Sequence, residues 1–157
     1  MLEWLTVLDL YAELRQIAEA LDEAGITYAV VGGLAVSIYT TPRATEDIDL
    51  LVAHPDVARA AATLTAHGFR AAGRPMRLVQ GRLEIQRLTK IDGADLLPVD
   101  LISPLSTELA ALLEDRHTVD LAGRPLSIIG VAGLRTLKRL RGSTVDRADL
   151  EALGEEP

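Results

Sequence analysis

Two aspartates, Asp47 and Asp49, occupy alternate positions at the start of the apolar stretch 48–53, which we interpret as a β-strand. Because successive side chains of a strand point to opposite faces of the sheet, both carboxylates should lie close together on one side. Like charges at such a separation repel each other, so a pair of this kind usually shares a proton or a cation. All-oxygen ligands favour magnesium or manganese over zinc. The equally simple alternative is a solvated pair at the start of a strand.

A pair of glycines, Gly32 and Gly33, ends an earlier apolar strand and precedes a short predicted helix. Glycine lets backbone N–H groups approach a ligand without a Cβ in the way, and the start of a helix favours an anion. A glycine pair alone more often marks only a turn. Here it is followed by the ordered pattern Arg43-x-Thr45-x-Asp47-x-Asp49. Phosphate at one end of the segment and metal at the other would suit a metal-bound nucleoside triphosphate.

The segment VGGLAVSIYTTPRATEDIDLLV resembles the nucleotidyltransferase superfamily related to DNA polymerase beta. In that superfamily, a Gly-Gly or Gly-Ser turn after the first strand is followed by an Asp-x-Asp pair on the next strand. The segment looks most like the small prokaryotic branch that includes the AbiEii-type toxins, and its glycine pair is also similar to that of aminoglycoside and lincosamide nucleotidyltransferases. The resemblance implies an α/β (α+β) nucleotidyltransferase fold, with a mixed β-sheet and helices packed on it.

The superfamily pattern asks for a third carboxylate on a later strand, and Asp100 fits it. Apolar residues flank Asp100 in the run Val-Asp-Leu-Ile, where an acid needs a partner. The alternatives are that Asp100 is a polar residue of a half-exposed strand, or that Asp92 or Asp95 in the preceding loop is the third acid.

The same prokaryotic branch tends to carry a lysine-bearing helix followed by an Asp-x-x-Asp helix. Lys138, Asp146 and Asp149 correspond to these positions, and the two acids share a helix face at a spacing of three. For Lys138 and Asp146, a purely structural role and a functional role have equal weight. For Asp149 the structural role has more weight. Ser143 and Asp146 resemble a helix-capping arrangement, and most lysines are simply solvated.

The resemblance implies that the chain transfers a nucleotide from a nucleoside triphosphate to an acceptor hydroxyl and releases pyrophosphate. Asp47, Asp49 and Asp100 would bind two magnesium ions, or manganese, and Asp100 could also assist deprotonation of the acceptor. The other implied contacts are to the phosphates. They would come from the backbone of Gly32 and Gly33 and from the side chains of Arg43 or Lys138, with Thr45 and Asp146 as additional candidates.

The acceptor stays open between RNA such as a tRNA end, a protein side chain and a small molecule, with a toxin–antitoxin or phage-defence context as one setting. A net charge of -7 argues against a broad nucleic-acid surface. A local basic patch could still reach an RNA end, or it could be only the cationic face of a helix. Its residues are Arg135, Lys138, Arg139, Arg141 and Arg147.

Two departures from the toxin branch bear on the acceptor. The toxins commonly have serine where this chain has Gly33, so any contact from that hydroxyl is absent. The chain is also shorter, which leaves out a further domain that could bind an acceptor. The alternative function is therefore a non-catalytic, antitoxin-like binding module of the same fold that docks on a partner protein.

The whole sequence of 157 residues predicts a single domain over residues 1–157. The absence of cysteine excludes disulfides and thiolate chemistry, and the three histidines are too scattered for a zinc site. No apolar run is long enough to span a bilayer, so we expect a cytoplasmic protein without membrane contact.

Hydrophobic periodicity and turn residues predict alternating helices and strands. Helices are expected over 7–21, 34–39, 55–67, 103–113 and two C-terminal segments that divide at 142–144. Strands are expected at 26–31, 48–53, 76–90 with a turn at 80–81, 96–102, 119–121 and 126–129. Pro98 should lie where its strand is at an edge or a bulge.

Overall fold

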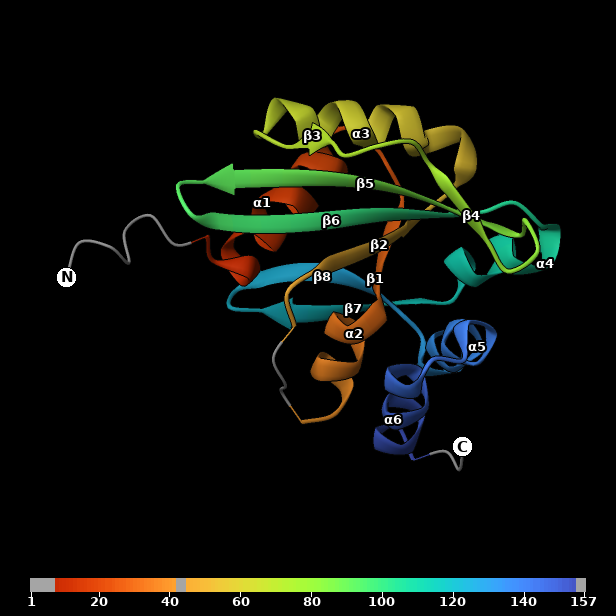
Figure 1. Ribbon diagram of the computed structural model, residues 1–157. Helices are drawn as coiled ribbons and strands as arrows, with labels where there is room; N and C mark the ends of the chain where they lie inside the picture. Colours follow the sequence, from red (N-terminus) through yellow and green to blue (C-terminus); the bar gives the residue numbers. More distant parts are fainter. Residues whose placement is uncertain (1–7, 42–44, 155–157) are drawn as a thin grey trace.

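The computed structural model describes residues 8–41 and 45–154, and it has the expected mixed α/β architecture (Figure 1). Within these residues the strands form one eight-stranded sheet. Residue 7, the first of the expected helix 7–21, and the candidate phosphate contact Arg43 lie outside the described ranges.

The strands of the sheet combine parallel and antiparallel pairs. Their order across the sheet is β3-β5-β6-β2-β1-β8-β7, and β4 pairs with β5 beside this path. The bounds are β1 (Tyr28–Val31), β2 (Ile48–Val52), β3 (Arg70–Ala71), β4 (Met76–Leu78), β5 (Leu83–Asp92), β6 (Asp95–Pro104), β7 (Arg116–Leu121) and β8 (Arg124–Ile129).

The centre of the sheet is formed by the apolar strands β1, β2 and β6. All four residues of β1 are buried, as are all of β2 except Asp49, because apolar side chains on both faces of a strand need cover on both sides. Strand β2 runs antiparallel to β1 and parallel to β6. These pairings place Val31, Asp49 and Asp100 side by side in one row across three strands.

The helices form two groups. Helices α1 (Leu10–Glu23) and α3 (Val57–Ala66) contact each other, and α2 (Gly32–Tyr39), α5 (Val131–Arg141) and α6 (Thr144–Ala152) form the second group (Figure 1). Short helical turns complete the set: α4 (Thr107–Ala110), η2 (His54–Asp56) and η3 (Ala111–Glu114).

Side-chain caps fix several of these helix starts. Asp9 accepts hydrogen bonds from two backbone N–H groups of α1, and Ser106 accepts one from the N–H of Leu109 in α4.

The structure corrects one predicted helix and confirms most other elements. A helix was expected to open at Ser103-Pro104, but both residues belong to β6, where they pair with Glu84 and Leu83 of β5. The helix begins only after the cap residue Ser106. Strand β6 pairs with β2 from Val99 onward, so Pro98 lies on a part of β6 that β2 does not cover, as an edge position requires.

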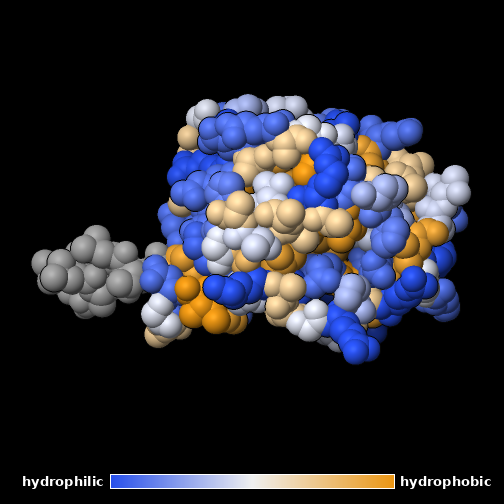
Figure 2. Space-filling view, turned by 90° about the horizontal axis from the view of Figure 1, so that it is seen from above, coloured by the Kyte–Doolittle hydropathy of each residue, from blue (hydrophilic) through white to orange (hydrophobic). Residues whose placement is uncertain are grey.

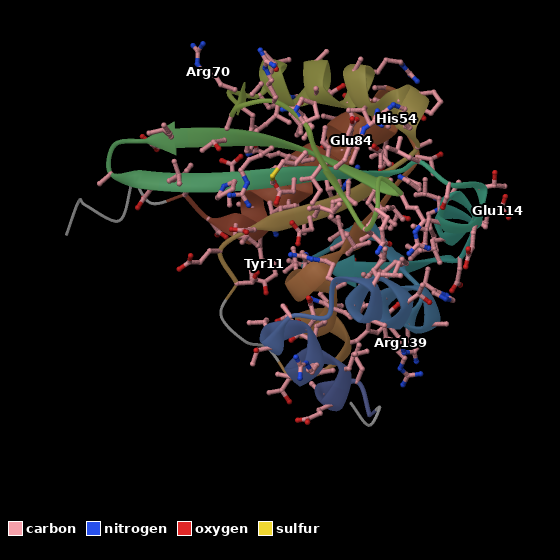
Figure 3. All side chains as sticks on the ribbon, turned by 45° about the vertical axis from the view of Figure 1, so that its right-hand side comes forward. Tyr11, His54, Arg70, Glu84, Glu114 and Arg139 are labelled. Atoms are coloured by element: carbon pink, nitrogen blue, oxygen red, sulfur yellow. The ribbon has the colours of Figure 1, made fainter. Side chains whose placement is uncertain are left out.

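The surface is mostly polar. The face seen from above in Figure 2 has hydrophilic residues around its rim and weakly to strongly hydrophobic residues across its centre. His54 of η2 lies beside Glu84 (Figure 3), with its Nδ1 3.5 Å from the Glu84 carboxylate. The same Nδ1 lies 3.1 Å from the Ser103 hydroxyl. Across the described ranges, no helix combines the length and apolar character needed to cross a membrane.

Candidate active site

Three carboxylates lie in one hollow of the sheet surface, which we call the carboxylate cleft. Asp49 and Asp100 are register partners on the parallel strands β2 and β6, so their side chains point to the same face. Asp47 precedes Asp49 by two positions and also lines the cleft, whose volume is about 530 Å³. The structure therefore brings Asp100 to the Asp-x-Asp pair, as the sequence pattern predicted.

The first glycine of the pair provides room for one of these carboxylates. Gly32 has φ +70°, a left-handed conformation that favours glycine. A Cβ on Gly32 would overlap the Asp49 carboxylate and would come within 2.9 Å of the Asp49 Cβ and Cγ atoms. Helix α2 begins at Gly32 rather than at residue 34, and Gly33 lines the carboxylate cleft. The glycine turn and the metal-binding candidates are therefore in direct contact.

The clustered carboxylates perturb one another. Burial, then the charges of Asp100 and Asp47, raise the pKa of the Asp49 carboxyl to about 7, although the positive charges of Arg141 and Lys138 oppose this. Burial also raises the pKa of the Asp47 carboxyl, against the charge of Arg87. The cleft thus carries more negative charge than its own cations compensate, which is the condition under which a metal ion is favoured.

Arg87 of β5 is the cation closest to the carboxylates. It lies opposite Asp100 in the β5–β6 pairing, and its guanidinium makes a two-pronged contact, with Nε 2.8 Å from Oδ1 and Nη2 2.9 Å from Oδ2. The same Nη2 lies 3.5 Å from Oδ2 of Asp47. The hydrogen bond to Asp100 raises the pKa of Arg87, so this residue stays charged. Arg87 was not among the site residues predicted from the sequence.

Lys138 has its main contacts at the edge of the cleft, with the two acids of α6. Its Nζ lies 3.2 Å from Oδ1 of Asp146 and 2.8 Å from Oδ2 of Asp149, and all three side chains are buried. Burial acts to raise the pKa of Asp146, but hydrogen bonds from the side chain and backbone of Ser143, together with the charge of Lys138, lower it overall. Ser143 and Asp146 also form a reciprocal capping box. This network attaches α6 to α5.

The remaining predicted residues are spread around the cleft. Thr45 lines it, and its hydroxyl lies 3.4 Å from the carbonyl oxygen of Asp47. Asp92 and Asp95 lie at the β5–β6 turn, whereas Asp100 lies in the middle of β6. Asp95 accepts a hydrogen bond from the N–H of Leu8. Among the described side chains, no group of three or more His, Cys, Asp or Glu residues is already arranged around a metal position.

The members of the predicted basic patch differ in their surroundings. Arg141 lines the carboxylate cleft, whereas Arg135 donates a hydrogen bond to the carbonyl oxygen of Leu153. Arg139 is exposed and points away from the sheet (Figure 3). Lys138 is buried with its acids. Of the helix α5 cations, Lys138 and Arg141 both line the cleft, and Arg141 is the exposed one of the two.

The comparisons with known proteins identify a family. A family model described as "Uncharacterised nucleotidyltransferase" matches residues 5–129, which is most of the chain. None of the curated proteins matches the chain significantly.

Solved structures with the same fold include three informative cases. An antigenic nucleotidyltransferase-like protein from Paracoccidioides brasiliensis is 18% identical, with a TM-score of 0.63 over 92% of this chain and 73% of that chain. The antibiotic-resistance factor ANT(2'')-Ia, in complex with adenylyl-2''-tobramycin, is 15% identical, with a TM-score of 0.61 over 91% and 86%. The lincosamide antibiotic adenylyltransferase LnuA, bound to lincomycin, is 17% identical, with a TM-score of 0.59 over 95% and 98%. At these identities the likeness shows the fold.

Replacing Gly32 by alanine should destabilise the protein more than the same change at Gly25. Both glycines have φ +70°, which costs alanine about 1–2 kcal/mol, but only Gly32 faces the Asp49 carboxylate, whereas a Cβ on Gly25 meets open space. The free energy of unfolding, measured by urea denaturation, should fall further for Gly32→Ala than for Gly25→Ala. Equal losses would show that Asp49 moves aside without cost.

The Asp49→Asn variant should change how stability depends on pH. Because the folded-state pKa of Asp49 is raised to about 7, its contribution to stability is fully present below the unfolded pKa and is lost as pH rises through about 7. In metal-free buffer, the melting temperature of Asp49→Asn relative to the wild type should therefore increase between pH 5 and pH 8. Asp120→Asn, at an exposed position of β7, serves as the control. A difference that does not vary with pH would contradict the raised pKa.

Lys138→Met should weaken the fold strongly, because it leaves two buried carboxylates without their cation. Breaking a buried ion pair from one side costs about 3–5 kcal/mol in the free energy of unfolding. Urea denaturation of Lys138→Met and of Arg139→Met, an exposed position on the same helix, measures the difference. Similar losses for the two variants would mean that the network contributes little.

Proposed function

Because the chain belongs to the uncharacterised nucleotidyltransferase family, we propose that it transfers a nucleotide from a nucleoside triphosphate to a hydroxyl group of a small molecule. The new bond joins the acceptor oxygen to the α-phosphorus, the bond from that phosphorus to the β-phosphate bridging oxygen breaks, and pyrophosphate leaves. The observation that carries the proposal is the convergence of Asp47, Asp49 and Asp100 in one cleft, beside a glycine turn that opens a helix.

The chemistry of the carboxylate cleft supports a proposal of divalent metal binding. Its three candidate ligands offer only oxygen atoms, the donors that magnesium and manganese prefer. Burial and mutual repulsion raise the pKa of Asp49, so a cation at this position would relieve an existing electrostatic cost. We propose that Asp47, Asp49 and Asp100 bind two metal ions. Bound magnesium would neutralise the triphosphate and stabilise charge on the attacking and leaving oxygens.

The phosphates are proposed to meet the backbone N–H groups at the start of α2. Gly32 and Gly33 leave this backbone uncovered, and the helix dipole favours an anion there. Arg141 lines the cleft and is a further candidate for the cationic role. Lys138 stays a candidate because it also lines the cleft, although its charge is engaged with Asp146 and Asp149. Arg43, outside the described ranges, stays a candidate for the same role. Thr45 and Asp146 line the cleft and stay additional candidates.

Asp100 stays the candidate for helping to remove the proton of the acceptor hydroxyl. Both of its carboxylate oxygens accept hydrogen bonds from Arg87. This role therefore requires Arg87 to release one of these oxygens when substrate binds.

A second hollow supports a small-molecule acceptor. It has a volume of about 410 Å³ and shares Thr45, Glu46 and Asp47 with the carboxylate cleft. Its other lining residues are mostly apolar, from the start of α1 and from the beginning of β6. Asp95 adds a further acid. An acceptor with an amine and apolar groups would suit this lining, whereas the phosphates of RNA would be repelled.

The relatives of known structure agree with this acceptor class, since two of them are described with antibiotics as adenylylated product or as bound ligand. We also propose that the protein is cytoplasmic. A role in a toxin–antitoxin system or in phage defence is part of the proposal only if RNA or protein proves to be the acceptor.

The test is a transfer assay with each nucleoside triphosphate labelled at the α-phosphate. The purified protein is incubated with magnesium and separate pools of aminoglycosides, lincosamides, RNA and protein. We expect label on a small-molecule pool, and a loss of at least about a hundredfold in Asp47→Asn and in Asp49→Asn, with Asp120→Asn unchanged. Transfer that survives both active-site changes would refute the mechanism. Label on RNA or protein instead would reassign the acceptor, and binding to a partner protein without any transfer would favour the non-catalytic alternative.

A further inference from the structure

We propose that Arg87 sets the metal affinity of the carboxylate cleft, because its guanidinium competes with the metal ion for Asp100 and Asp47. This inference rests on the proposed function, since it concerns the same carboxylates. In the metal-free protein the guanidinium supplies the positive charge that the acids need. Metal binding then requires Arg87 to release Asp100.

The contacts of Arg87 single out two of the three carboxylates. Its guanidinium uses both Nε and Nη2 on Asp100 and extends Nη2 toward Asp47. The planar fork of arginine matches a carboxylate in this geometry, which makes the contact stronger than a single ion pair. A metal ion bound to the same oxygens would stand close to a second positive charge. The two cations are therefore alternatives at Asp100.

The burial of the partners shows which of them can move. The Asp100 side chain is only 11% exposed and is fixed on a central strand, whereas the Arg87 side chain is 46% exposed on the cleft wall. Arginine has a long side chain with several rotatable bonds, so it can swing into the cleft without a change in the sheet. Asp100 can thus exchange its partner while keeping its own position.

The remaining acid explains why the exchange is favourable. Among the described residues, Arg87 makes its hydrogen bonds with Asp100 and Asp47, while Asp49, the register partner of Asp100, lines the same cleft. One guanidinium therefore compensates only part of the cleft. A divalent ion carries twice the charge in a smaller volume.

The test measures Mn²⁺ binding without nucleotide, by titration calorimetry or by the electron paramagnetic resonance signal of free Mn²⁺. Arg87→Gln should bind Mn²⁺ roughly tenfold more tightly than the wild type, because a competing cation is gone. Arg77→Gln is the matched control, since Arg77 is an exposed arginine of β4 outside the cleft. The Mn²⁺ affinity of this variant should stay within roughly twofold of that of the wild type. Arg87→Lys, which keeps the charge but loses the fork, should fall between Arg87→Gln and the wild type.

The melting temperature gives an independent measurement. Without metal, Arg87→Gln should melt below the wild type because Asp100 loses its partner, and saturating Mn²⁺ should raise its melting temperature by more than that of the wild type. If Arg87→Gln fails to fold, the same comparison is made with Arg87→Lys.

The outcomes separate this inference from the proposed function. Equal or weaker Mn²⁺ binding by Arg87→Gln would overturn the role of Arg87 while leaving the metal site in place. Mn²⁺ binding that is absent from the wild type and from every Arg87 variant, or that Asp49→Asn does not weaken, would remove the metal site and with it the proposed function.

Discussion

The structure depends on one row of residues across the sheet, in which Val31, Asp49, Asp100 and Arg87 are successive register partners. Side chains in such a row point to the same face, so the pairing of four strands determines which charges meet. The row begins at the residue before the glycine turn and ends at a cation. A shift of one residue in any of these pairings would turn an acid into the apolar core.

This row explains how an apolar sheet accommodates several acids. The other residues of β2 and the neighbours of Asp100 are buried, so the strands are held by hydrophobic packing on both faces. The carboxylates lie where the sheet surface borders the cleft. Their repulsion is tolerated because Arg87 contacts two of them and because Gly32 leaves space for the third. The helix pair α5–α6 keeps its own charges balanced by the buried Lys138 network.

Much of this arrangement could be predicted from the sequence, and the missing part has a physical reason. The Asp-x-Asp alternation and the glycine pair are local signals, so their position at one cleft followed from strand periodicity and from a family resemblance. Arg87 depends on the register of β5 against β6, which periodicity does not give. A signal was available in Gly93-Ala94, because glycine at the first of two loop residues is typical of a tight hairpin turn, and a turn there pairs residue 92 with 95 and residue 87 with 100. The Ser103-Pro104 start was wrong because a local helix signal was overridden by strand pairing.

The hairpin origin of the Arg87–Asp100 contact has a consequence for folding. These two residues are only 13 positions apart and belong to one continuous hairpin, whereas Asp49 comes from a strand much earlier in the chain. Contacts between residues close in sequence lose less chain entropy on closure and tend to form earlier. Asp100 can therefore already be paired with Arg87 when β2 docks beside β6. The chain then need not bring three uncompensated carboxylates together while the sheet assembles.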